Sequence, residues 1–200
     1  MDRVLDFSLS VKHPAAPQLG RMMAMMDRVR MHTVGAAVEL TTEQLDHQHD
    51  AFANSIGMLL GHLVYNDVAF RAYFCEDREL TDAEEKEWGA GRHLWTRGRA
   101  EFRNRPLAHY VDALRANLML TLESLAGAED AWLDIVPRRV RGEGQSATNG
   151  YLLFHKIEDE CRHQGQILWL LHRVPGYRLE FWNRPSADRP SSMGSSSEHV

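Results

Sequence analysis

Apolar residues recur every three or four positions over four long stretches of the chain, which is the spacing of an amphipathic helix. The stretches cover residues 17–38, 56–74, 107–125 and 151–174. In the first of them, Leu19, Met22 and Met26 fall on one helical face. Strand signals are weak, because β-branched runs are few and Asn149-Gly150 comes directly before a predicted helix. The pattern therefore predicts an all-α protein built as a four-helix bundle with short connecting helices.

Short helices are predicted in the connections between the long ones. Thr41 with Gln44, and Thr81 with Glu84, match the capping box, in which a threonine and a residue three positions later satisfy free N–H groups at a helix start. Residues 1–15 are predicted to be an extended lead-in and residues 16–183 the bundle. The Ser/Pro-rich residues 184–200 are predicted to be a disordered tail.

Composition excludes several classes of protein. The chain has 200 residues, of which 44% are hydrophobic, and this is near the globular average. A net charge of −5 argues against a dedicated nucleic-acid binder. No apolar run approaches the ~20 residues of a membrane span, and the first residues lack the basic start and apolar core of a signal peptide. We therefore expect a cytoplasmic protein that binds neither nucleic acid nor membrane.

Polar residues interrupt the apolar faces of two of the long helices. His155, Asp159 and His163 are four positions apart, so they form one column on the last helix. On the second, His62 lies among apolar residues and glycines. Side chains one helical turn apart can chelate one divalent cation, and a facing His62 would complete a set of two imidazoles and one carboxylate. Three protein ligands leave coordination positions open, as in catalytic zinc sites. The same set also suits nickel or ferrous iron.

Each of these segments also has a simpler interpretation. A single histidine on an apolar face, such as His62, is more often a hydrogen-bonded core residue. An aspartate and a histidine four apart, such as Asp159 and His163, are commonly a solvated pair. The residues alone leave the metal site and these alternatives open. Cys161 is turned about 200° away from Asp159 around the helix and is predicted to pack in the core.

Two segments of the chain resemble the DinB/YfiT-like family. LTTEQL followed by NSIGMLLGH, within residues 40–62, matches the family's "LTxEQL" helix and "NSIGxLLxH" helix. LFHKIEDECRHQGQI, at residues 153–167, is similar to the family's last bundle helix, "LxHxxEHExxHxGQI". The resemblance spans about residues 15–178, with both motifs in the family's order. It implies a DinB/YfiT-like four-helix bundle with a divalent metal near one end.

Carried over residue by residue, the resemblance implies that His62, Asp159 and His163 are the metal ligands. Position 159 departs from the family's pattern, because most members have histidine there and the mycothiol-dependent maleylpyruvate isomerase branch has glutamate. The shorter aspartate would bind the metal less closely or through water. His155 matches a frequent family histidine that is not a consistent ligand. Gln166, one turn beyond His163, is expected to hydrogen-bond a ligand histidine or a metal-bound water.

The resemblance and the residues together leave functions of three classes open. The first is a metal-dependent S-transferase that joins a low-molecular-weight thiol to a small electrophile, because a metal with open positions lowers the pKa of a bound thiol. Carboxylates of that thiol could bind to Arg138, Arg139 and Arg141, although a solvated loop is the simpler interpretation of these arginines. The second is a non-catalytic, dimeric stress-response bundle with a vestigial or regulatory metal site, and the third a structural bundle without metal. Members of the family are often dimers, so a homodimer is expected. The sequence identifies no catalytic residue.

Overall fold

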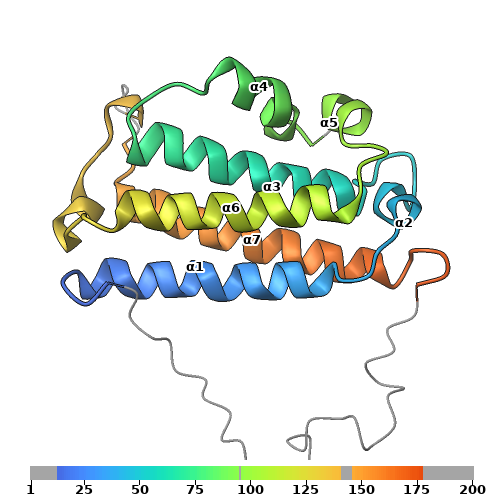
Figure 1. Cartoon of the computed structure of the whole chain (residues 1–200), viewed down its shortest axis with the longest axis horizontal. Coiled ribbons are helices and arrows are strands. Elements are labelled where there is room, and N and C mark those ends of the chain that lie inside the picture. Colours follow the sequence, from blue (N-terminus) through green and yellow to red (C-terminus); the bar gives the residue numbers. More distant parts are fainter. Residues whose placement is uncertain (1–12, 95, 141–145, 178–200) are drawn as a thin grey trace, which may run out of the picture.

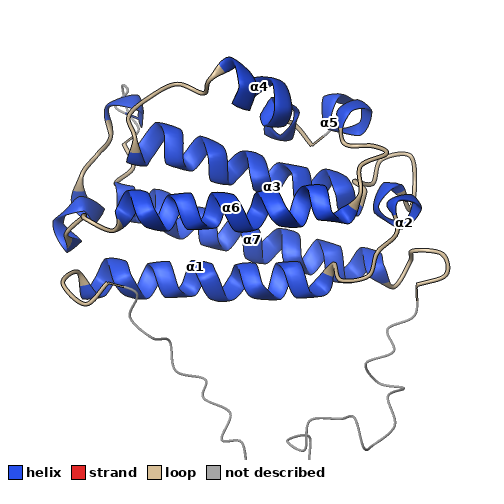
Figure 2. Cartoon of the chain, viewed as in Figure 1, coloured by secondary structure: helices blue, strands red, loops and turns tan. Residues whose placement is uncertain are grey.

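Four long helices lie side by side in a computed structural model of the protein, which describes residues 13–94, 96–140 and 146–177 (Figure 1). They are α1 (Pro17–Ala36), α3 (Ile56–Phe70), α6 (Leu107–Leu125) and α7 (Asn149–Leu171). The shorter helices are α2 (Thr42–Asp46), α4 (Asp82–Trp88) and α5 (Thr96–Glu101), of which α4 and α5 cover the outer side of α3. The described residues form helices and loops without a strand (Figure 2). None of the described helices has the length and apolar character that crossing a membrane requires. The predicted all-α bundle is confirmed.

Capping groups explain where three of the long helices begin, because they satisfy N–H groups that have no partner inside the helix. The Ser55 hydroxyl accepts the N–H three residues later at 3.2 Å and starts α3. Thr148 does the same for α7 at 3.3 Å. The cap of α1 comes from elsewhere in the chain, since the Asp130 carboxylate accepts the N–H of Leu19 at 2.9 Å. Helix α7 therefore begins two residues before the predicted position.

The predicted connections are right in part. Both capping boxes, at Thr41 and Thr81, are present and start α2 and α4. The predicted helix over residues 56–74 ends at Phe70 and continues as a π-helical turn, η1 (Arg71–Cys75). The helix that begins after Thr81 continues as a 3₁₀ turn, η2 (Gly89–Arg92). Helix α5 was not predicted, because its sequence TRGRAE has no apolar stripe. The predicted lead-in and tail lie mostly or wholly outside the described residues.

Charged side chains are buried at the centre of the bundle. Arg30 on α1 donates to Asp67 on α3 and to Glu160 on α7, both at 2.7 Å. It also donates to the carbonyl oxygen of Leu114 on α6 at 2.6 Å. Lys156 on α7 donates to Asp67 as well. We call Arg30, Asp67, Lys156 and Glu160 the buried charge cluster, because none of them is more than 8% exposed. The hydrogen bonds of Arg30 therefore link all four long helices.

The buried charge cluster separates two apolar cores. One core includes Val64 and Tyr110, and the other includes Met26 and Leu153. Two cations face two carboxylates, so the cluster carries no net charge. Burial alone would raise the pKa of Asp67, but the neighbouring cationic side chains hold that pKa below its usual value. The carboxylate therefore stays ionised inside the protein.

Candidate metal site

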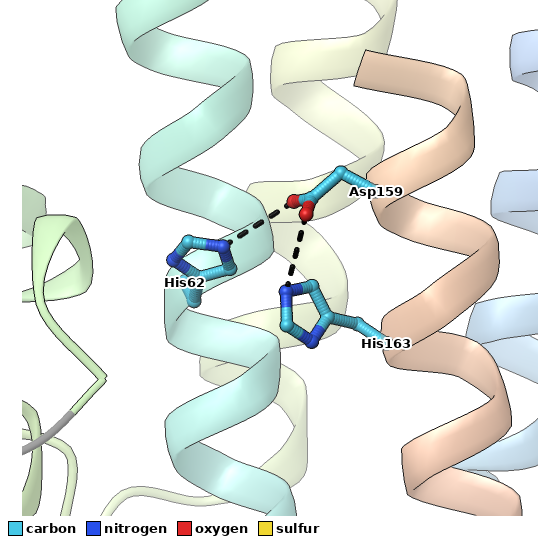
Figure 3. Close-up of side chains that lie close together, drawn as sticks. All are labelled: His62, Asp159 and His163. Atoms are coloured by element: carbon cyan, nitrogen blue, oxygen red, sulfur yellow. Dashed lines mark hydrogen bonds and ion pairs between the residues drawn. The ribbon is translucent and has the colours of Figure 1, made fainter. Parts of the chain in front are cut away.

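Three side chains of the ligand types seen in metalloproteins meet between α3 and α7 (Figure 3). His62 projects from α3, and Asp159 and His163 project from α7. His62 Nε2 lies 3.3 Å from one carboxylate oxygen of Asp159, and His163 Nε2 lies 3.5 Å from the other. Each residue offers one ligand atom, and these atoms lie within 4.8 Å of one another. The structure thus brings together the three residues singled out in the sequence, here called the His62–Asp159–His163 triad.

Hydrogen bonds behind the two imidazoles direct their Nε2 atoms toward Asp159. His62 Nδ1 lies 2.6 Å from the carbonyl oxygen of Gly91, which can only accept, so Nδ1 carries the proton. His163 Nδ1 donates in the same way to the side-chain oxygen of Gln166 at 2.8 Å. Nε2 of each ring is then the atom free to take a proton or a metal. Two such nitrogens and one carboxylate around a common point are a donor set that fits a divalent cation.

The charges in the triad follow from these contacts. Burial alone would raise the pKa of Asp159, but its interaction with His163 holds that pKa well below its usual range. Burial likewise would lower the pKa of His163, but the interactions with Asp159 and Gln166 raise it above its usual value. An ionised carboxylate and a proton-binding imidazole therefore face each other, and a metal ion must displace that proton to bind.

Comparison with known proteins establishes the family. The family model of the DinB superfamily matches residues 25–167, which include the whole triad. The chain belongs to the DinB superfamily. The crystal structure of a conserved protein from Enterococcus faecalis has the same fold, with a TM-score of 0.62 and 17% sequence identity over 84% of this chain and 98% of that chain. A search of curated proteins finds no match. The motif resemblance is thus confirmed at the level of family and fold.

In this member of the DinB superfamily, Gly91 positions His62 through its backbone, a role that was not predicted from the sequence. Turn η2 lies so close to α3 that a Cβ atom added to Gly91 would lie 2.5 Å from the Cβ of Tyr65 and 2.8 Å from the carbonyl oxygen of Gly61. Only glycine permits this approach, and the approach brings the Gly91 carbonyl to His62. A glycine just after a short helix ordinarily indicates a helix end, so the sequence holds no clear sign of this role.

Gly91→Ala is expected to weaken metal binding about 10- to 100-fold, as the loss of a hydrogen-bond partner behind a ligand typically does. The added methyl group pushes η2 away from α3 and lengthens the bond to His62. We also expect a loss of about 1–3 kcal/mol in the free energy of unfolding from overpacking. Calorimetric titration with Zn²⁺ and urea denaturation measure the two effects. In Gly35→Ala, whose Cβ meets nothing within 4 Å, metal affinity should be unchanged. Equal affinities of wild type and Gly91→Ala would contradict the assigned role.

Gln166 and His155, the other predicted site residues on α7, differ in how they are placed relative to the triad. Gln166 contacts the triad through His163, as described above. His155 is exposed, lies 3.4 Å from a carboxylate oxygen of Glu158 and stacks on Tyr151. His155 lines the same cavity as His62 and Asp159. Cys161 is exposed, so its predicted packing in the core is wrong. The reason is that α7 turns this side of its surface away from the other long helices.

Of the arginines before α7, the two that the structure describes pair with residues outside the triad. Arg138 is exposed and lies 3.8 Å from Asp77. Arg139 pairs with Glu79, and its guanidinium lies over the ring of Tyr73 at 4.0 Å. Arg141 falls outside the described residues. Neither Arg138 nor Arg139 is among the residues that line the cavity beside the triad.

Two hollows lie along α3 and α7, and triad residues line one of them. The smaller has a volume of about 240 Å³ and is lined by His62, Asn66, Ala69, Phe70, Phe74, Leu152, His155, Lys156 and Asp159. The larger has a volume of about 500 Å³ and is lined by Phe52, Ala53, Asn54, Leu59, Arg162, Gly165, Gln166, Trp169 and Leu170. His62 and Asp159 line the smaller hollow directly. No triad residue lines the larger hollow, whose wall includes Gln166, the hydrogen-bond partner of His163.

Proposed function

We propose that this DinB-superfamily protein binds a divalent metal ion through His62, Asp159 and His163 and transfers a low-molecular-weight thiol to a small electrophile. The observation that carries the proposal is the convergence of two Nε2 atoms and an ionised carboxylate, each imidazole being fixed by a hydrogen bond to its Nδ1. This donor set suits zinc, nickel or ferrous iron. Three protein ligands leave positions open for a substrate.

The chemistry requires a thiolate. A divalent metal with open coordination positions lowers the pKa of a thiol, and the thiolate is the competent nucleophile. In the reaction the sulfur forms a bond to an electrophilic carbon, the leaving group departs with its bonding electrons, and the thiol proton passes to a base.

The two hollows suit the two substrates. Phe70, Phe74 and Leu152 give the smaller hollow an apolar wall, which favours an uncharged or aromatic electrophile. Its volume of about 240 Å³ is below that of a typical drug-sized ligand site, so the electrophile is small. Arg162, which also pairs with Glu158 at 2.6 Å, and Gln166 give the larger hollow hydrogen-bond donors for a polar thiol that carries a carboxylate. We therefore add Arg162 to the arginines before α7 as a proposed carboxylate-binding residue.

A conjugation assay tests the proposal. Protein loaded with Zn²⁺ or Ni²⁺ is mixed with glutathione or cysteine and 1-chloro-2,4-dinitrobenzene, and product absorbance is followed. We expect a rate above that of chelator-treated protein, and in His62→Ala a fall to the chelated level. His32→Ala, on the exposed side of α1, should match wild type. An unchanged rate in His62→Ala would count against metal-dependent thiol transfer. Stoichiometric metal without any thiol reaction would favour the non-catalytic, regulatory bundle.

The other partners expected from the sequence stay predictions. A homodimer is expected from the family resemblance, and light scattering of the native protein should then give about twice the 22.9 kDa of the chain. Side chains of α7 that lie exposed, among them Tyr151, Phe154 and Leu168, would be covered in such a dimer. A mass equal to that of one chain would contradict the expectation.

A further inference from the structure

We propose that Asn66 is a fourth protein ligand, whose side-chain oxygen turns toward the metal when the metal binds. The inference rests on the proposed metal site. Asn66 lies on α3, one helical turn beyond His62. Its amide nitrogen lies 2.7 Å from Asp159 Oδ2 and 3.0 Å from His62 Nε2. It thus touches two of the atoms that would bind the metal.

The spacing of these atoms matches that of neighbouring ligands around one cation. Metal–nitrogen and metal–oxygen bonds of about 2.0–2.2 Å place adjacent ligand atoms about 2.8–3.6 Å apart, depending on coordination number. The end of the Asn66 amide, His62 Nε2 and Asp159 Oδ2 form a triangle with sides of 2.7, 3.0 and 3.3 Å. The amide therefore lies at or just inside ligand distance from both partners without any movement of the backbone.

The amide nitrogen of Asn66 donates hydrogen bonds to two atoms that would both be ligands of a bound cation. His62 Nε2 and Asp159 Oδ2 are both acceptors, and the Asn66 NH₂ group donates to each of them. An amide nitrogen has no lone pair for a metal, whereas the carbonyl oxygen of asparagine is a common ligand. The terminal torsion of asparagine is broad and roughly two-fold, so a half-turn exchanges the two atoms in place. Metal binding then replaces two hydrogen bonds by one coordination bond.

A fourth ligand also bears on which metals are compatible with the proposed thiol transfer. With two nitrogens and two oxygens from the protein, a four-coordinate metal would have no open position left, whereas a six-coordinate metal would keep two. Thiol transfer with Asn66 bound therefore requires a metal that takes more than four ligands, such as nickel or ferrous iron.

Two substitutions of Asn66 separate ligation from mere hydrogen bonding. The affinity for Ni²⁺ is measured by competition with a chromophoric chelator, and the visible spectrum of the Co²⁺-loaded protein reports coordination number. Asn66→Leu keeps the shape of the side chain without its oxygen, and we expect weaker binding together with more intense Co²⁺ bands. The loss of a hydrogen-bond partner behind a ligand also weakens binding about 10- to 100-fold, so the change in the Co²⁺ bands is the result that identifies ligation. Asn66→Asp supplies a charged oxygen in the same place and should bind as tightly as wild type or tighter. Gln18→Leu, an amide removed from the surface of α1, is the control.

Each outcome of these measurements supports or contradicts a specific claim. Wild-type affinity in Asn66→Leu would overturn the inference. Binding by Asn66→Asp that is weaker than that of Asn66→Leu would overturn it too, because a carboxylate would then repel Asp159 instead of joining it on the metal. Asn66→Asp also serves if Asn66→Leu fails to fold. A wild-type protein that binds no metal would contradict the proposed function itself, whereas metal binding that does not depend on Asn66 contradicts only this inference.

Discussion

His163→Ala is expected to weaken the binding of Zn²⁺ or Ni²⁺ by more than about 100-fold, which is beyond the usual effect of losing a hydrogen-bond partner behind a ligand. The substitution removes a nitrogen ligand and leaves Asp159 with a single imidazole neighbour in the triad. Metal content is measured by mass spectrometry on protein purified without a histidine tag, and affinity by calorimetric titration. Wild type should carry near-stoichiometric metal after incubation with the ion, and His163→Ala almost none.

Two further variants make this result specific. His172→Ala removes an exposed imidazole just after α7 and should bind metal like wild type. Gln166→Leu keeps the His163 ligand but removes the acceptor that orients its ring, so its affinity should fall between those of wild type and His163→Ala. Stoichiometric metal in His163→Ala would contradict the triad as the metal site. Equal losses in Gln166→Leu and His163→Ala would mean that ring orientation, rather than the ligand itself, dominates the affinity.

The triad could be predicted from the sequence because its members break a local pattern. His62 stands alone in an apolar run, and Asp159 and His163 repeat at the helical spacing of four. Such signals depend only on neighbours along the chain. The sequence does not show how far α3 is shifted along its axis relative to α7. The contact between His62 and Asp159 depends on that shift. The family motifs supplied that pairing by analogy.

The groups missed in the sequence act through the tertiary structure. Gly91 acts through a carbonyl group, which every residue has, and its lack of a side chain matters only because α3 lies close by. Asn66 lies on the same helical face as His62. An asparagine at such a position is equally typical of a side chain exposed to solvent, so the sequence does not single it out. Arg30 was passed over because hydropathy patterns assign arginine to the surface. The buried face of α1 in fact runs from Met26 through Arg30 to Thr33.

Arg30→Met is expected to lower the free energy of unfolding by about 3–5 kcal/mol, the usual cost of breaking a buried ion pair on one side. Methionine fills most of the volume, but Asp67 and Glu160 are then left buried with Lys156 as the cationic partner in the cluster. Urea denaturation measures the change. Arg97→Met, which removes an exposed ion pair with Glu101 on α5, should leave the stability almost unchanged. A loss from Arg30→Met no larger than that from Arg97→Met would contradict the burial argument.

We propose that the buried charge cluster serves to position the proposed metal site rather than to add stability. Asp67 follows Asn66 in the chain, and Glu160 follows Asp159. The hydrogen bonds from Arg30 to Asp67 and Glu160 would therefore hold α3 and α7 in register next to the proposed site. Replacing the whole cluster with apolar residues of similar volume (Arg30→Met, Asp67→Leu, Lys156→Met, Glu160→Leu) should preserve stability, as it does for other buried ion networks. Helices α3 and α7 could then slide, and metal affinity should fall although every ligand is present. A quadruple variant that is stable and binds metal like wild type would show that apolar packing alone sets this register.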